Sequence, residues 1–244
     1  MISVCIATYN GERFIREQIE SIVCQLNADD EIIVSDDGST DNTLAIVRAI
    51  GDKRIRIIEG PRKHSPTLNF ECALKAANGD YIFLADQDDV WKPNKVEVCM
   101  KWLQNYYCVV ADAEVTDSAL KTQFPSLYGL LGVRQGKLYN TLWKNGYTGC
   151  CMAFRRPVLQ AALPFPSDIP MHDIWIGNVA AYKCNVKFIS DKLILFRRHE
   201  DTISCNGKGS KFSLWQQLIF RWNIIKNLSF ALAKLLFNEI ITLI

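Results

Sequence analysis

The sequence has no long apolar run, no excess of one charge, and little glycine or proline. Its 244 residues include 13 Gly and 8 Pro, which excludes collagen-like and linker-like chains. The 28 Lys and Arg against 26 Asp and Glu leave a formal charge of +2, which excludes an acidic disordered chain and argues against a dedicated nucleic-acid binder. No stretch of about 18 uncharged apolar residues occurs, so no membrane span is predicted. What remains is a globular chain, 49% hydrophobic, with enough apolar residues for one compact core.

A disulfide framework and a secretion signal are also missing. The nine cysteines are odd in number, form no CxxC pair and lie mostly in apolar runs, where a free thiol behaves as a small hydrophobic side chain. The apolar start, Ile2–Ala7, is too short for a signal-peptide core and has no basic residues before it. These patterns predict reduced, structural cysteines and a cytoplasmic protein.

The first 110 residues alternate short β-rich runs with helical patterns. Strands are predicted at 2–8, 31–35, 54–58 and 81–85, and helices at about 11–26, 41–50, 68–76 and from 93 onward. Strands separated by helices imply right-handed crossovers. The fold class is therefore α/β, with a mostly parallel central sheet flanked by helices.

The second half is less regular. Strands are predicted at 147–154 and 187–197 and a helix at 172–182, whereas 116–146 show no clear period and receive no prediction. We expect one domain over 1–205, with halves of about 1–110 and 111–205, and a separate C-terminal helical tail over 206–244.

Polar, turn-forming clusters follow three predicted strands, at Thr8–Gly11, Ser35–Asp41 and Asp86–Asp89. In open parallel sheets, ligands bind at the carboxyl ends of the strands. Loops there are rich in Asp, Asn, Gly and Ser because these residues cap helices and form turns, but capping does not explain so many carboxylates. The sequence predicts a ligand site at this edge of the sheet.

The Asp86–Asp89 cluster carries three carboxylates in four residues. They repel one another unless a cation or several N–H donors neutralise them. Oxygen ligands suit Mg²⁺ or Mn²⁺, which complete their coordination with substrate phosphates. Asp36 and Asp37, beside a Gly turn, are suited to accept hydrogen bonds from a ribose or a base. No P-loop and no GxGxxG motif occurs, so we expect a diphosphate substrate but neither an ATPase nor a dinucleotide dehydrogenase.

Three strings in this order resemble the family 2 glycosyltransferases, inverting enzymes of the Rossmann-like GT-A fold that use nucleotide sugars. The strings are Ile6-Ala7-Thr8-Tyr9-Asn10-Gly11, then Asp36-Asp37-Gly38-Ser39-Thr40-Asp41, then Gly79-Asp80-Tyr81 leading into Asp86-Gln87-Asp88-Asp89-Val90-Trp91. The last string, with Asn69-Phe70 before it, is similar to a bacterial branch of rhamnosyltransferase-like enzymes of surface polysaccharides such as lipopolysaccharide and capsule. The resemblance covers about 2–205.

The resemblance implies a role for each matching residue. The residues expected to contact the nucleotide are Thr8, Tyr9, Asn10, Asp36, Asp37 and Asp86. The metal, Mn²⁺ or Mg²⁺, is expected to be bound by Asp88 and by His199 of the string Arg197-Arg198-His199. The residues expected to position the donor or acceptor are Asp89, Trp91, Gly149, His172, Arg197 and Arg198. The implied activity is that of a hexosyl- or rhamnosyltransferase with a UDP- or dTDP-linked donor and a glycan acceptor.

Asp173 is the predicted catalytic base. Direct displacement with inversion needs a group that takes the proton of the acceptor hydroxyl. An Asp at the start of a helix can also be present only because the helix dipole favours it. In the family, an Asp in this place, followed by an aromatic residue, is the base, and Asp173 with Trp175 matches that pattern.

The tail, 206–244, carries +4, against −2 for 1–205. One helical face presents Trp215, Leu218, Ile219, Trp222 and Ile225, with basic residues at its border. A basic helix with tryptophans predicts binding to an anionic membrane surface, and the alternatives are packing on the domain or a homodimer interface. Membrane binding would make the protein peripheral on the inner face of the cell membrane and suit a lipid-linked acceptor.

Two other classes stay open. A sugar-1-phosphate nucleotidyltransferase also uses a sheet, a nucleotide and a metal, but it normally needs a Gly-rich basic loop that Thr8–Gly11 does not provide. A non-catalytic glycan- or lipid-binding protein could keep the same fold. The sequence does not specify the sugar, the acceptor or the linkage.

Overall fold

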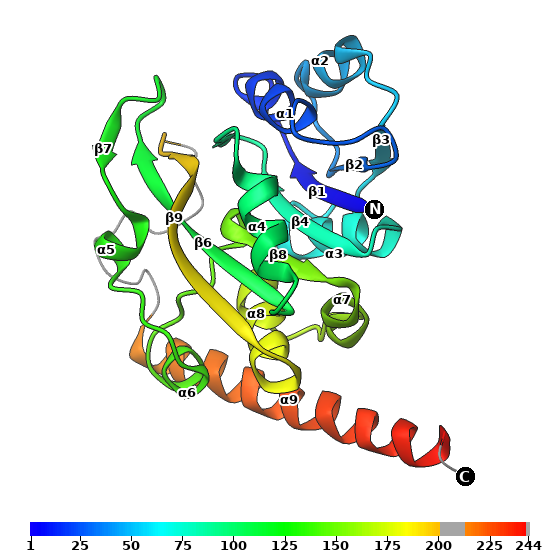
Figure 1. Ribbon diagram of the computed structural model, residues 1–244, viewed down its shortest axis with the longest axis vertical. Coiled ribbons are helices and arrows are strands. Elements are labelled where there is room, and N and C mark those ends of the chain that lie inside the picture. Colours follow the sequence, from blue (N-terminus) through cyan, green and yellow to red (C-terminus); the bar gives the residue numbers. More distant parts are fainter. Residues whose placement is uncertain (201–212, 243–244) are drawn as a thin grey trace.

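The computed structural model describes residues 1–200 and 213–242 (Figure 1). In this part of the chain one sheet has the strand order β3-β2-β1-β4-β8-β6-β9-β5, and β7 pairs with β6. The strands are β1 (Ile2–Thr8), β2 (Glu31–Asp36), β3 (Ile55–Glu59), β4 (Tyr81–Asp86), β5 (Val90–Trp91), β6 (Cys108–Thr116), β7 (Thr122–Phe124), β8 (Met152–Arg155) and β9 (Val186–Arg197).

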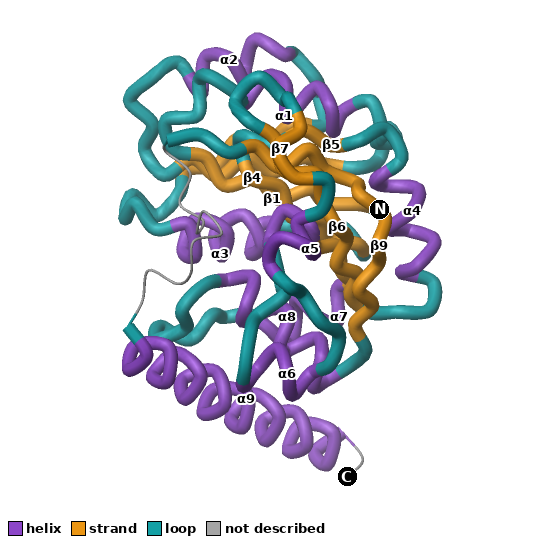
Figure 2. Tube along the Cα trace, turned by 90° about the vertical axis from the view of Figure 1, so that its left-hand side faces the viewer, coloured by secondary structure: helices purple, strands orange, loops and turns teal. Residues whose placement is uncertain are grey.

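Helices cover both faces of this sheet: α1 and α2 lie on one side and α3 on the other (Figure 2). The helices are α1 (Ile15–Val23), α2 (Thr43–Ile50), α3 (Pro66–Ala76), α4 (Lys95–Leu103), α5 (Leu127–Leu131), α6 (Lys137–Leu142), α7 (Arg156–Ala162), α8 (His172–Lys183) and α9 (Leu214–Thr242). This arrangement confirms the predicted α/β class.

The N-terminal half follows the sequence prediction closely. Strands β3, β2, β1 and β4 pair in parallel, and each begins and ends within about one residue of the predicted bounds. The register places Thr8 opposite Asp36 and Ala7 opposite Asp86. The three polar loops that follow β1, β2 and β4 therefore start at one edge of the sheet, as parallel strands require.

The second half is mixed rather than mostly parallel. Strand β8 runs antiparallel between β4 and β6, and β6 pairs in parallel with β9. The predicted strand at 147–154 is wrong in its first part, because Gly149–Cys151 form a 3₁₀ turn and β8 begins at Met152. A close approach explains the turn: a Cβ on Gly149 would lie 2.9 Å from the His172 ring nitrogen Nε2.

Residues 116–146, which received no prediction, contain β7, α5 and α6. Helices of five and six residues are too short to show a helical period. The segment is held instead by Asp112 of β6, whose carboxylate accepts hydrogen bonds from Ser126 Oγ (2.6 Å) and from the Tyr128 N–H (2.9 Å).

Helix α9 packs against the domain through one narrow side. Ile224 and Leu228 are buried. Asp168 anchors the same side: its carboxylate pairs with Lys226 and accepts a hydrogen bond from Asn227 Nδ2 at 2.7 Å. None of the helices in the described part of the chain combines the length and apolar character that a bilayer crossing requires.

The cysteines in the described part of the chain are all free thiols. Five of them, Cys5, Cys99, Cys108, Cys150 and Cys151, are buried. Burial raises the pKa of the Cys99 thiol to about 12, so this side chain stays protonated and acts as a small apolar group.

Candidate active site

The loops after β1 and β4 are joined by the side chain of Gln87. Its Oε1 accepts a hydrogen bond from the Tyr9 N–H at 2.9 Å, and its Nε2 donates to the Tyr9 carbonyl at 3.1 Å. The amide packs so closely that a Cβ on Gly11 would lie 2.4 Å from Oε1. The Gln of the Asp-Gln-Asp-Asp string thus fixes one loop against the other, a role that sequence reasoning did not assign.

The loops after β1 and β2 are joined through Asp36. Its buried carboxylate accepts hydrogen bonds from Thr8 Oγ1 (3.0 Å), Ser39 Oγ (2.6 Å) and the backbone N–H groups of Gly38 (3.1 Å) and Ser39 (2.8 Å). Asn10, at a φ of 48°, adds a bond from the Thr40 N–H to its Oδ1. Thr8 and Asp36 therefore hold the two loops together through hydrogen bonds within the protein.

Asp37 organises a third segment, the loop between β3 and α3. Its two carboxylate oxygens accept hydrogen bonds from the N–H groups of Lys63 and Ser65, each at 3.0 Å. Between them His64 adopts a φ of 49°, and its ring meets the Tyr9 ring edge to face with centroids 4.4 Å apart. Tyr9 is 40% exposed and His64 is exposed, so this ring pair is open to a ligand. Sequence reasoning assigned nothing to His64, because no nearby pattern links it to Tyr9.

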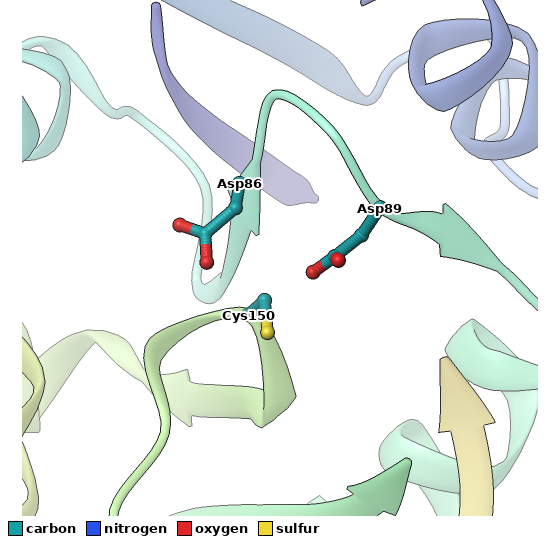
Figure 3. Close-up of side chains that lie close together, drawn as sticks. All are labelled: Asp86, Asp89 and Cys150. Carbon is teal, nitrogen blue, oxygen red and sulfur yellow. The ribbon is translucent and has the colours of Figure 1, made fainter. Parts of the chain in front are cut away.

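Carboxylates gather where β4 ends. Asp86 and Asp89 point toward Cys150, and one ligand atom from each lies within 4.8 Å of the others (Figure 3). Asp89 is 1% exposed: one oxygen accepts the Arg197 N–H at 2.9 Å, and the other has no hydrogen-bond partner among the described residues. Asp88 is half-buried, with Oδ2 2.8 Å from His199 Nε2.

The pKa values of these carboxyl groups are perturbed by burial and by one another. Burial, then the charges of Asp88 and Asp173, raise the pKa of Asp86 to about 7. Burial, then the charges of Asp88 and Asp86, also raise the pKa of Asp89 well above its usual range. Raised carboxyl pKa values mean that the ionised cluster has too little positive charge around it.

The counter-charge that the structure does supply is Lys95. It is fully buried below the cluster, donates from Nζ to the Cys150 carbonyl at 2.6 Å and lies 4.1 Å from the centre of the Trp91 ring. Burial lowers its pKa, so it compensates the carboxylates only in part. Nothing in its sequence context, the first turn of a surface helix, distinguishes it from a solvated lysine.

Two groups could hold a divalent cation. The Asp86, Asp89 and Cys150 group is compact, but hydrogen bonding with Cys151 and burial raise the pKa of the Cys150 thiol well above its usual range, and metals bind the thiolate. Asp88 and His199 offer a carboxylate oxygen and an imidazole nitrogen at half-buried positions, donors that Mn²⁺ accepts. The donor chemistry therefore favours Asp88 and His199, with the charge of Asp86 beside them.

Arg197 does not face the site. Its guanidinium donates to the carbonyls of Asp88 and Ser118, each at 2.7 Å, and pairs with Glu17. This side chain, 3% exposed, clamps the Asp88 loop to β9 and α1, so the predicted positioning role of Arg197 would be indirect, through that loop. Arg198 is half-buried, and its backbone N–H donates to the Thr116 carbonyl at 2.9 Å.

The side chains of Trp91 and His172 are also buried. Trp91, 2% exposed, packs against Phe83 in the core, so its predicted positioning role would be indirect. His172 stacks on Phe70 with centroids 4.1 Å apart, and in the described part of the chain neither of its buried ring nitrogens has a hydrogen-bond partner. Burial lowers the pKa of His172 to about 3, so the ring is neutral and serves as a wall behind Gly149.

Asp173 lies in the first turn of α8 and faces the carboxylates of β4. Its Oδ2 accepts the Gly149 N–H at 3.1 Å, and its Oδ1 accepts the Ile174 N–H at 2.7 Å. Burial raises its pKa to about 6, while these backbone hydrogen bonds oppose the rise. The charge of Asp173 in turn raises the pKa of Asp86, which shows that the two halves of the chain bring their acids together.

The sequence model of glycosyl transferase family 2 matches residues 3–163. The chain belongs to this family. The predicted family is confirmed, and the family match argues against a sugar-1-phosphate nucleotidyltransferase. The chain is a family 2 glycosyltransferase that uses nucleotide sugars.

Two bacterial relatives match over most of the chain. The UDP-Glc:alpha-D-GlcNAc-diphosphoundecaprenol beta-1,3-glucosyltransferase WfgD of Escherichia coli is 28% identical over 237 residues, which cover 92% of this chain and 85% of the relative. The dTDP-rhamnosyl transferase RfbG of Shigella flexneri is 28% identical over 242 residues, 90% of this chain and 82% of the relative.

Solved structures of low sequence identity share the fold. S. aureus TarS 1-349 in complex with UDP-GlcNAc has a TM-score of 0.69 at 19% identity, covering 94% of this chain and 66% of that one. Glucosyl-3-phosphoglycerate synthase from Mycobacterium tuberculosis, with Mn²⁺ and UDP, has a TM-score of 0.59 at 19% identity, covering 95% and 79%. The GT-A fold is confirmed by these neighbours.

Proposed function

We propose that the protein is an inverting, metal-dependent transferase that moves a hexosyl or rhamnosyl group from a UDP- or dTDP-linked donor to a hydroxyl of a lipid-linked surface glycan. The observation that carries the proposal is the turn at Gly149–Cys151, which links the two sets of acids: Asp173, at the start of α8, accepts the Gly149 N–H at 3.1 Å, and Cys150 lies within 4.8 Å of the carboxylates at the end of β4. WfgD is named for a UDP-glucose donor and a diphosphoundecaprenol-linked acceptor, and RfbG for dTDP-rhamnose.

The nucleotide would bind along the loops after β1 and β2. Tyr9 and His64 present their rings to it, and Asn10 an exposed polar side chain. Asp36 and Asp37, whose oxygens are already hydrogen-bonded within the protein, would support nucleotide binding by holding these loops in place. The direct base and ribose contacts assigned to them from the sequence become an indirect role in this proposal.

Asp88 and His199 would hold Mn²⁺ or Mg²⁺. The cation would neutralise charge on the leaving diphosphate, and the neighbour from Mycobacterium tuberculosis is named with Mn²⁺. Clustered carboxylates with raised pKa values are what such a cation would stabilise. Asp86 would face the diphosphate side, and Asp89 would hold the loop through the backbone of Arg197.

Asp173 would act as the base. With a pKa of about 6 it is ionised at neutral pH and still basic enough to take a proton in the transition state. As the acceptor oxygen bonds to the anomeric carbon, its proton passes to the free lone pairs of Asp173, and the bond to the diphosphate oxygen breaks. Attack from the face opposite the diphosphate inverts the anomeric configuration.

Nucleotide binding is tested by thermal unfolding with UDP, dTDP and GDP, each with and without Mn²⁺. One nucleotide should stabilise the protein by several degrees and only with the metal, because a ligand that binds the folded state shifts the unfolding equilibrium. Asp88→Asn should abolish the metal-dependent part. Asp29→Asn, an exposed acid at the opposite edge of the sheet, is the matched control and should behave as the unmodified protein. Equal shifts for all nucleotides, or none, would contradict the proposal.

Catalysis is tested with Asp173→Asn. The variant should bind the nucleotide and Mn²⁺ normally and transfer sugar about 10²–10⁴-fold more slowly, the usual contribution of a general base. The product of the unmodified protein, examined by NMR, should carry the anomeric configuration opposite to that of the donor. Retained configuration, or full activity of the variant, would rule out this mechanism.

A further inference from the structure

Helices α6 and α9 together carry a group of exposed apolar side chains. Three are tryptophans, Trp143 at 73% exposure, Trp215 at 72% and Trp222 at 64%. Leu142, Leu218 and Ile219 lie with them at 41–55% exposure. We call these six residues the tryptophan surface. Soluble proteins rarely expose so many large apolar side chains together without a partner for them.

The two helices are joined where the tryptophans meet. They lie side by side at one end of the molecule (Figures 1 and 2). Arg221 on α9 donates from Nη2 to the carbonyl of Trp143, the residue after α6, at 2.6 Å. Residues almost 80 positions apart in the sequence therefore form one surface.

The domain leaves this surface uncovered because α9 uses another side for packing. Ile224 and Leu228 are buried, and Asp168 holds Lys226 and Asn227 on that side. Trp215, Leu218 and Trp222, spaced three and four residues apart, lie on the outward side. Packing on the domain and binding of a further partner, alternatives from the sequence alone, are thus compatible: each uses its own side of the helix.

Charge distinguishes the partners that could cover the tryptophan surface. The sequence has no Asp or Glu from Ser118 to Ser167, nor from Ser213 to Asn238, the two stretches that supply the surface. Exposed basic side chains lie on and beside α6, at Arg134, Lys137 and Lys144. Within these two stretches, a second copy placed symmetrically would bring basic side chains together with no acid to pair them.

We propose that the tryptophan surface docks on a bilayer of anionic phospholipid. Tryptophan rings prefer the boundary between headgroups and acyl chains, and lysines and arginines nearby pair with anionic headgroups. An amphipathic helix lying flat on a membrane has this composition. The proposal goes beyond the proposed function, since binding to lipid depends on neither nucleotide nor metal.

The test is co-sedimentation with vesicles, without nucleotide or metal, so that a failed transferase assignment leaves it unaffected. The protein should bind phosphatidylglycerol-containing vesicles and not pure phosphatidylcholine, and ~0.5 M salt should weaken binding by screening. Trp215→Ala with Trp222→Ala should lower the partition coefficient by about tenfold or more for each ring removed. Lys137→Glu with Lys144→Glu should weaken binding to anionic vesicles alone.

The control is Phe124→Ala, which removes an aromatic side chain of 43% exposure on β7, outside the tryptophan surface, and should bind vesicles as before. Circular dichroism and sugar transfer to a water-soluble acceptor should be unchanged in all variants, which shows that they are folded. Three results would overturn the proposal: no binding to anionic vesicles, equal binding by the double tryptophan variant, or a dimer that these tryptophans maintain and that does not bind lipid.

Discussion

The two acid groups at the sheet edge are built in opposite ways. Asp36 and Asp37 accept hydrogen bonds at each carboxylate oxygen from nearby N–H and O–H groups. Burial instead raises the pKa values of Asp86, Asp89 and Asp173, and repulsion from neighbouring carboxylates adds to the rise at Asp86 and Asp89. The first group stabilises the loops at the expense of direct ligand contact. In the second group the ionised form is disfavoured by burial, and under the proposed function a metal would offset this cost and Asp173 would take the acceptor proton.

Substitution in the two groups should therefore change stability in opposite directions. Asp36→Ala should lower the free energy of unfolding by about 3 kcal/mol, because it leaves several donors without a partner. Asp86→Asn should raise it by about 2 kcal/mol above neutral pH, because it removes a buried charge with a pKa of about 7. Urea unfolding with the exposed Asp29→Asn as a control measures both. The same sign for both substitutions would contradict the comparison.

The pH dependence of kcat and that of the free energy of unfolding should differ in sign, because both depend on the ionisation of Asp173. Asp173, with a pKa of about 6, must be ionised to act as a base, so kcat should fall about tenfold per pH unit below 6. Its effect on stability has the opposite sign. Because the pKa in the folded state is above the ordinary value of 3.8, the folded state binds more protons between these pH values, and the free energy of unfolding falls as pH rises through this window.

Matched pH profiles of the Asp173→Asn variant provide the check. Its unfolding free energy should depend less on pH between about 4 and 6 than that of the unmodified protein. Identical slopes would show that Asp173 keeps an ordinary pKa in the folded state.

The smallest effect is expected at the ring pair. His64→Ala should weaken nucleotide binding about three- to tenfold, the range for losing one aromatic contact, with little change in kcat. Lys63→Ala removes an exposed side chain from the same loop but keeps the backbone N–H that Asp37 binds, so it is the matched control. Equal affinity of the two variants would mean that His64 does not contact the nucleotide.

The sequence predicted the first half of the fold well because each element there has a local cause. Strand β1 is a continuous apolar run, buried along most of its length, and α1 shows apolar residues at helical spacing. The strand prediction was wrong for the first part of 147–154 because the backbone turns at Gly149, where it contacts His172 and Asp173, which are distant in sequence. No local pattern records such a contact.

The same distinction applies to the site. Asp86, Asp88 and Asp173 were predicted from motifs, since chemistry requires those residue types at strand and helix ends. The loop-holding contacts of Arg197 were not predicted, because in sequence a basic residue beside a His matches a diphosphate ligand equally well. Only its contacts with Asp88, Ser118 and Glu17 show that it clamps the loop. Lys95 was missed because a buried lysine looks like a surface one in sequence.

By itself, the sequence determined the family, the α/β order of the first half and the acids that meet at the sheet edge, because motifs and apolar periods are local. Only the tertiary structure decided which acids have their oxygens hydrogen-bonded within the protein and which have raised pKa values, and which side of α9 packs. Those outcomes depend on burial and on partners that lie far away in the chain, and both exist only once the chain has folded.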